Sequence, residues 1–248
     1  MFDIIIKGGT VYDGTGRGGI RTDVGISGDS IVAVGDLGDR EAAKIVDASG
    51  KSVAPGFIDT HSHSDLRLLV GEPPTLKLAQ GITTEILGQD GLSVAPIVDK
   101  DIPLYQKMLQ GLLGDHDLEW KWRSAAEYLD ALAAKTLPLN VAYLVPHGPI
   151  RTAVMGMDNR HATDSEVNSM RPMLDRGLAE GGCGLSTGLI YPPCSFANSD
   201  ELTELCKIAA KHDLPFVVHM RDEGYNIMSA VDEVLDIDRK STRLNSSH

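Results

Sequence analysis

The chain has 248 residues, 42% of them hydrophobic and 23% charged, which is typical of a globular protein with a sizeable core and excludes a disordered chain. Its formal net charge of −12 and pI near 5.0 argue against nucleic-acid or anionic-membrane partners, because the average field of the protein repels both. Three cysteines without framework spacing, no export signal and no 18-residue apolar run predict a cytoplasmic protein without disulfides or a membrane span.

Residues 1–54 have the pattern of short strands separated by glycine-containing turns. The expected strands are Asp3–Lys7, Thr10–Tyr12, Asp23–Ile26, Ser30–Val34 and Lys44–Asp47. The run Ser27-Gly28-Asp29 lies between two of these strands and predicts a hairpin turn. This part of the chain is therefore expected to be all β.

After residue 54, apolar strands alternate with amphipathic helices, as in βα units around a parallel sheet. The expected strands are Phe57–His63, Thr83–Gly88, Asn140–Pro146, Gly182–Thr187 and Leu214–His219. The expected helices are Pro74–Gln80, Leu104–Leu113, Ala125–Lys135, Asp164–Glu180, Ser199–Lys211 and Gly224–Leu235. Active sites of parallel α/β barrels lie at the carboxyl ends of the strands, so these ends are the places to look for chemistry.

The first of these strands ends in two histidines, His61 and His63, separated by one residue. If the strand extends to His63, both imidazoles point to the same side, together with Asp59. Neutral imidazoles beside carboxylates suit a divalent transition metal such as zinc. The alternative is that the His-x-His spacing arose by chance on an exposed strand or turn.

Two segments resemble the metal-dependent amidohydrolase superfamily. The first barrel strand of that superfamily is similar to the run Pro55-Gly56-Phe57-Ile58-Asp59-Thr60-His61-Ser62-His63. The opening strands of its small β-sandwich are similar to Ile4–Gly14. The resemblance implies an α/β fold: a partial TIM-type (β/α) barrel with about five of eight strands, preceded by an N-terminal piece of the sandwich. The implied domains are 1–54 (sandwich), 55–239 (truncated barrel) and 240–248 (an unrelated or disordered tail). A natural flexible tail is the alternative for the last segment.

Later segments narrow the resemblance to the N-acyl-D-amino-acid deacylases, or D-aminoacylases. Their second strand is usually followed by Gly-Asn-Cys-Gly-x-Ser, whose cysteine binds metal, and this chain has Gly88-Gln89-Asp90-Gly91-Leu92-Ser93. Asp90 in place of cysteine is a plausible ligand, but a harder one than thiolate, so it favours zinc less exclusively. The alternative is that Asp90 only caps the turn before Gly91.

Five more residues are assigned roles by the resemblance of three further segments. The segment around His147 is similar to Gly-His-Gly-x-x-Arg, which makes His147 a candidate for substrate contact or a purely structural histidine. The segment 182–193 is similar to Ser-Ser-Gly-Leu-x-Tyr-x-Pro and offers the hydroxyls of Ser186 and Tyr191 to a substrate. The last segment resembles His-x-Arg-x-Glu, in which His219 is a metal ligand and Arg221 meets the substrate carboxylate.

The implied activity is metal-dependent hydrolysis of N-acyl-D-amino acids, small-molecule substrates, by one or two Zn²⁺ or similar ions at His61, His63, Asp90 and His219. Dihydropyrimidinases, which place a carbamylated lysine on the fourth strand, fit less well, because no lysine lies between Glu180 and Cys206. The family's general acid/base aspartate is expected beyond the chain end, so a truncated, weakly active form is expected. The alternatives are another amidohydrolase, such as a dihydropyrimidinase or deaminase, and a metal-binding remnant without catalysis. The oligomeric state does not follow from the sequence.

Overall fold

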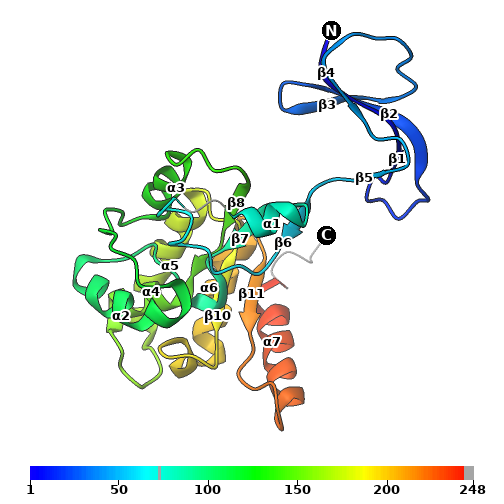
Figure 1. Cartoon of the computed structure of the whole chain (residues 1–248). Coiled ribbons are helices and arrows are strands. Elements are labelled where there is room, and N and C mark those ends of the chain that lie inside the picture. The colour runs from blue at the N-terminus through cyan, green and yellow to red at the C-terminus, as the bar shows by residue number, and fades with distance from the viewer. Residues whose placement is uncertain (72–73, 243–248) are drawn as a thin grey trace. The chain divides into compact units, whose positions relative to one another are not determined.

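The computed structural model describes residues 1–71 and 74–242, and the chain divides into two compact units, Met1–Phe57 and Ile58–His248 (Figure 1). The division falls near residue 54, where the sequence pattern changes from all-β to alternating strands and helices. Among the described residues, no helix has the length and apolar character that crossing a bilayer demands.

The first unit is one five-stranded sheet. Its strands are β1 (Phe2–Val11), β2 (Ile20–Ser27), β3 (Ser30–Gly35), β4 (Ala42–Asp47) and β5 (Ser52–Val53). The order is β3-β2-β1-β4, with β5 also paired to β1. The hairpin turn predicted at Gly28 is confirmed: Ser27 pairs with Ser30, and Gly28 has a φ of +61°.

One expectation about this sheet is wrong. The segments Asp3–Lys7 and Thr10–Tyr12 are expected as separate strands, but one continuous strand, β1, runs through both and ends one residue before Tyr12. The two glycines between them lie at an irregularity in the pairing of β1 with β2, between Ile6 and Gly9. Glycine is common at such bulges because it adopts the required backbone conformation, and Gly8 has a φ of +73°.

The second unit is a mixed α/β arrangement of short strands. They are β6 (Phe57–Asp59), β7 (Ile82–Leu87), β8 (Asn140–Tyr143), β9 (Val145–Pro146), β10 (Leu185–Gly188) and β11 (Phe216–His219). One sheet has the order β6-β7-β8 and the other β9-β10-β11. The pairs β7–β8, β9–β10 and β10–β11 are parallel. Strands β8 and β9 are consecutive parts of one segment interrupted at Leu144, so this segment joins the two sheets.

Helices follow the strands of this unit in the chain (Figure 1). They are α1 (Thr75–Ala79), α2 (Ile102–Leu113), α3 (Ala125–Ala133), α4 (His147–Met155), α5 (Asp164–Ala179), α6 (Ser199–Lys211) and α7 (Ile227–Thr242). Helices α4 to α7 pack in sequence, each against the next. Helix α7 includes residues 240–242 of the segment expected as a tail, and residues 243–248 lie outside the described part of the chain.

Helix α4 has no counterpart among the expected helices. Gly148 and Pro149 lie in its first turn, where proline is tolerated because its missing N–H has no helical partner anyway. Most of α4 is buried, including His147 and Arg151, so its sequence lacks the polar face that identifies a surface helix. His147 therefore begins a helix directly after β9.

Candidate metal centre

Strand β6 positions the two histidines of the His-x-His motif. It ends at Asp59, earlier than the predicted end at His63, because the Asp59 carboxylate accepts the backbone N–H of His61 at 3.2 Å and turns the chain. The backbone N–H of Ser62 then donates to the carbonyl of Ile86 on β7 at 3.2 Å. The histidines thus lie on a bend after the strand and not on the strand itself.

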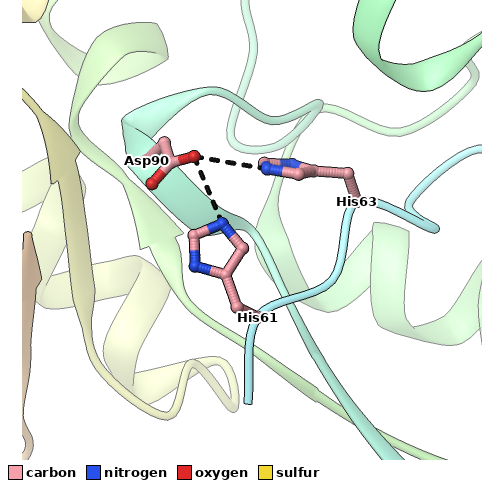
Figure 2. A group of neighbouring side chains, drawn as sticks. All are labelled: His61, His63 and Asp90. Atoms are coloured by element: carbon pink, nitrogen blue, oxygen red, sulfur yellow. Dashed lines mark ion pairs between the residues drawn. The ribbon is translucent and has the colours of Figure 1, made fainter. Parts of the chain in front are cut away.

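Both imidazoles nevertheless converge on Asp90 (Figure 2). The Nε2 atoms of His61 and His63 lie 3.3 and 3.2 Å from the same carboxylate oxygen, Oδ2 of Asp90. One ligand atom from each of the three side chains lies within 4.8 Å of the other two. The structure therefore brings together three of the four predicted metal ligands from two separate segments of the chain.

The spacing of these donor atoms fits a tetrahedral ion. Zinc bonds of about 2.0–2.1 Å to nitrogen and oxygen, at tetrahedral angles, place neighbouring ligand atoms roughly 3.3 Å apart. The two nitrogen-to-oxygen distances at Asp90 have this value. The partial burial of Asp90 raises its pKa, but the hydrogen bond from His63 and the nearby imidazoles outweigh burial and hold the pKa below its usual value. The carboxylate is thus in the ionised form that a metal requires.

His219 is a third histidine near Asp90. It is the last residue of β11, and its Nδ1 lies 3.7 Å from the other carboxylate oxygen of Asp90. Its Nε2 lies 3.6 Å from Glu223, and its ring meets the ring of Tyr191 edge-on at 5.0 Å. The fourth predicted ligand is thus beside Asp90 but farther from it than the two histidines of the motif.

Asp90 is held on a tight loop, Gly88–Gly91, that leaves β7. Asp90 has a φ of 58°, a left-handed conformation that is uncommon for residues other than glycine. The side-chain amide of Gln89 donates to the carbonyls of Thr60 and Ile86, at 2.8 and 3.0 Å. Gln89 thereby ties the loop of Asp90 to the segment immediately before His61.

A buried ionic cluster beneath the His-x-His motif was missed by sequence reasoning. Lys77 of α1 donates to Asp59, Ser62 and Glu85, at 2.8, 2.8 and 2.7 Å. Glu85 is fully buried on β7 and also accepts the hydroxyl of Ser62. The signal in the sequence was a glutamate inside a predicted strand of a parallel sheet, because a buried carboxylate requires a partner. The cluster fixes residues on both sides of His61.

Two of the predicted substrate contacts, His147 and Ser186, are completely buried. His147 bonds to Thr187 at 3.0 Å and Glu201 at 2.8 Å. Burial alone lowers the pKa of His147, but Cys194 and Glu201 raise the pKa to about 9. The hydroxyl of Ser186 bonds to the backbone of the Gly88–Gly91 loop. Both side chains therefore have internal partners and no surface to offer to a substrate.

The other two predicted substrate contacts, Arg221 and Tyr191, are partly exposed but have different neighbours. Arg221 lines a pocket of about 660 Å³ whose other lining residues lie mainly on the segments 159–161 and 195–199. Its guanidinium donates twice to Glu233, at 3.0 Å each, and to the carbonyls of Ser195 and Ala197. Tyr191 is half-buried against His219. Tyr191 is thus beside the candidate metal group, whereas Arg221 is turned into an ion pair with α7.

This chain is similar to several known proteins over most of its length. Residues 44–191 match a family described as the amidohydrolase family. A D-aminoacylase of Alcaligenes xylosoxydans xylosoxydans is 41% identical over 239 residues, which are 96% of this chain and 48% of that protein. An N-acyl-D-glutamate deacylase of the same organism is 41% identical over 241 residues, 96% of this chain and 48% of that protein.

This chain is also similar to a solved structure of a deacylase. The N-acyl-D-glutamate deacylase from Bordetella bronchiseptica, complexed with zinc and a phosphonate inhibitor that mimics the tetrahedral intermediate of the reaction, aligns with a TM-score of 0.88 at 38% identity. The alignment covers 97% of this chain and 49% of that one. The chain spans about half the length of the curated relatives it matches.

Proposed function

The chain belongs to the amidohydrolase family, and from this premise we propose that it carries the metal centre of a hydrolase that cleaves the amide bond of N-acyl-D-amino acids. The products are a carboxylate and a free D-amino acid. The observation that carries the proposal is the convergence of His61 and His63 on Asp90, at distances that suit a shared ion. The relatives named D-aminoacylase and N-acyl-D-glutamate deacylase support the substrate class.

The proposed cofactor is one or two divalent ions, with zinc the first choice because the solved relative holds zinc. When bound, such an ion polarises an amide carbonyl and lowers the pKa of water. The carboxylate of Asp90 is a harder ligand than thiolate, so the site also suits manganese or cobalt. Two neutral imidazoles and one carboxylate leave a net positive charge on a divalent centre, which favours attraction of an anionic substrate.

Residues around the centre have proposed supporting roles. His219 is the fourth ligand candidate, and the carboxylate of Glu223 at 3.6 Å is placed to orient its ring. Tyr191 packs against that ring, so its hydroxyl is our candidate for contact with the substrate carbonyl. Arg221 is our candidate for the substrate carboxylate, and this role requires the guanidinium to exchange its ion pair with Glu233 for the ligand.

We also propose that the second unit is part of a TIM-type barrel. Strands β6, β7, β8 with β9, β10 and β11 are neighbours in chain order, which is the order of successive βα units in such a barrel. The candidate ligands lie after β6, after β7 and at the end of β11, all at carboxyl ends of strands. This is the face of the fold where barrel enzymes carry their active sites.

A substrate panel tests the proposed function. Zinc-loaded protein is incubated with N-acetyl-D-amino acids, their L enantiomers and cyclic ureides, and the free amino acid is quantified over long incubations. We expect zinc-dependent release from the D substrates alone, lost in His61→Ala and kept in His212→Ala, since His212 pairs with Asp175 at the end of α6. Release from L substrates, ring opening of the ureides, or release that persists in His61→Ala contradicts the proposal.

A further inference from the structure

The hydroxyl of Ser186 closes the loop that carries Asp90. Ser186 lies on β10, where it pairs with Pro146 of β9 and Val217 of β11, and its side chain is completely buried. The hydroxyl donates to the carbonyl of Gly88 and accepts the backbone N–H of Gly91 at 3.1 Å. One side chain therefore holds the loop on both sides of Asp90.

The backbone of this loop is left-handed at three residues and tightly packed against β10. Gly88, Asp90 and Gly91 all have left-handed φ angles, of 76°, 58° and 65°. A Cβ on Gly188 of β10 would lie 2.4 Å from the carbonyl oxygen of Asp90, so the loop lies directly against that strand. The left-handed conformation costs glycine nothing but is less favourable for aspartate, so contacts with the surroundings help to hold Asp90 in it. The two bonds to Ser186 are among these contacts.

The sheet itself does not depend on this hydroxyl. Backbone pairing with β9 and β11 fixes the register of β10, and those bonds use main-chain atoms alone. Removing the hydroxyl leaves the strand in place but frees the Gly88 carbonyl and the Gly91 N–H, which are polar atoms between the loop and β10. The loop is therefore the part of the structure that responds.

We propose that Ser186 is a positioning residue for the metal centre: its hydroxyl holds the Gly88–Gly91 loop so that Asp90 meets His61 and His63. This inference rests on the proposed metal centre and adds to it a residue that touches neither the ion nor the substrate. It also gives a physical reason for a buried serine at this position of β10. If the hydroxyl of Ser186 is removed, we expect weaker metal binding, because the carboxylate of Asp90 is then misplaced.

Zinc affinity measures this role directly, by competition with a chromophoric chelator and without reliance on turnover. We expect Ser186→Ala to weaken zinc binding by about 10–100-fold, as is usual for residues that orient a metal ligand. The matched control is Thr203→Val on α6, which removes a buried hydroxyl bonded to the Ser199 carbonyl at 2.7 Å. We expect the control to bind zinc within about 3-fold of the parent protein, a difference of about 0.7 kcal/mol, because the bond of Thr203 lies within α6.

A double-mutant cycle separates positioning from general loosening. If Ser186 acts through Asp90, Ser186→Ala should cause no further loss of zinc affinity in the Asp90→Ala background. Ser186→Cys serves if the alanine variant fails to fold, because it keeps a side chain at the position with only a weak donor, and we expect it also to weaken zinc binding.

The outcomes distinguish this inference from the proposed function. If the parent protein binds zinc and Ser186→Ala or Ser186→Cys binds it equally tightly, the role of Ser186 is overturned and the metal centre stands. The same conclusion holds if Ser186→Ala weakens binding equally with and without Asp90. If the parent protein does not bind zinc, both the centre and the inference fail.

Discussion

Replacing Lys77 with methionine tests the ionic cluster beneath the His-x-His motif. The ammonium of Lys77 lies 2.8 Å from Asp59 and 2.7 Å from Glu85, and it also donates to Ser62. Partial burial alone lowers the pKa of Lys77, but the hydrogen bonds to Asp59 and Glu85 raise it above its ordinary value. Lys77→Met keeps the length of the side chain and removes its charge, so Glu85 stays buried without its cation.

The expected loss of stability follows from the burial of Glu85. Its side chain has no exposed surface, whereas 27% of the Lys77 side chain is exposed. Breaking a buried ion pair costs about 3–5 kcal/mol, and the exposure of Lys77 places this pair near the lower end, at about 3 kcal/mol. That is a large share of the roughly 5–15 kcal/mol by which domains are stable. Glu85→Gln in the same chain should recover much of the loss, because it removes the unpaired charge.

Urea unfolding, followed by circular dichroism, measures these differences. The control is Lys207→Met, which breaks the partly exposed pair between Lys207 and Glu204 on α6 and should cost less than about 1 kcal/mol. The reasoning is refuted if Lys77→Met costs no more than this control, or if adding Glu85→Gln to it makes the loss larger. Either result would mean that the buried charge of Glu85 is not stabilised by Lys77.

Three further predictions concern helix caps, acid sensitivity and metal. Ser124 accepts the N–H of Glu127 at the start of α3, so Ser124→Ala should lower the free energy of unfolding by about 1 kcal/mol in urea titrations. The hydrogen bond from Arg160 holds the pKa of Glu166 well below its usual range. The ionised Glu166 therefore contributes its full stability above the pKa that this side chain has in the unfolded chain, and the contribution is lost as pH falls through its lower pKa in the folded protein. We expect Glu166→Gln to flatten the acid side of a plot of unfolding free energy against pH. Zinc at 100 times its Kd should add about 2.7 kcal/mol of stability in the same titrations, an effect that EDTA reverses and that is smaller in Asp90→Ala at the same zinc concentration.

Local sequence patterns predicted much of the second unit. The strands and most helices occur where periodicity placed them, because each has an apolar face or an apolar run that its neighbours bury. The buried helix α4 was missed for the opposite reason, since it shows no polar face. The end of β6 was misplaced because the turn depends on one hydrogen bond, from His61 to Asp59.

The sequence predicted the side chains that could bind the metal, but not the contacts that hold the surrounding residues in place. The spacing of His61 and His63 and the placement of Asp90 after the next strand are local features, and the structure brings them together. The contacts of Ser186 and Arg221 depend on residues far along the chain or on other elements. Gly88 is 98 residues from Ser186, and the ion pair of Arg221 forms with α7. Such tertiary partners leave no trace in a short motif.

The central claim is that imidazole and carboxylate groups, and no thiolate, surround the ion. X-ray absorption at the zinc edge of the zinc-loaded protein tests it most directly. We expect a nearest shell of nitrogen and oxygen at about 2.0–2.1 Å, with outer scattering from imidazole rings. A sulfur shell at about 2.3 Å, contributed by Cys183, Cys194 or Cys206, or a spectrum without imidazole scattering, would contradict it.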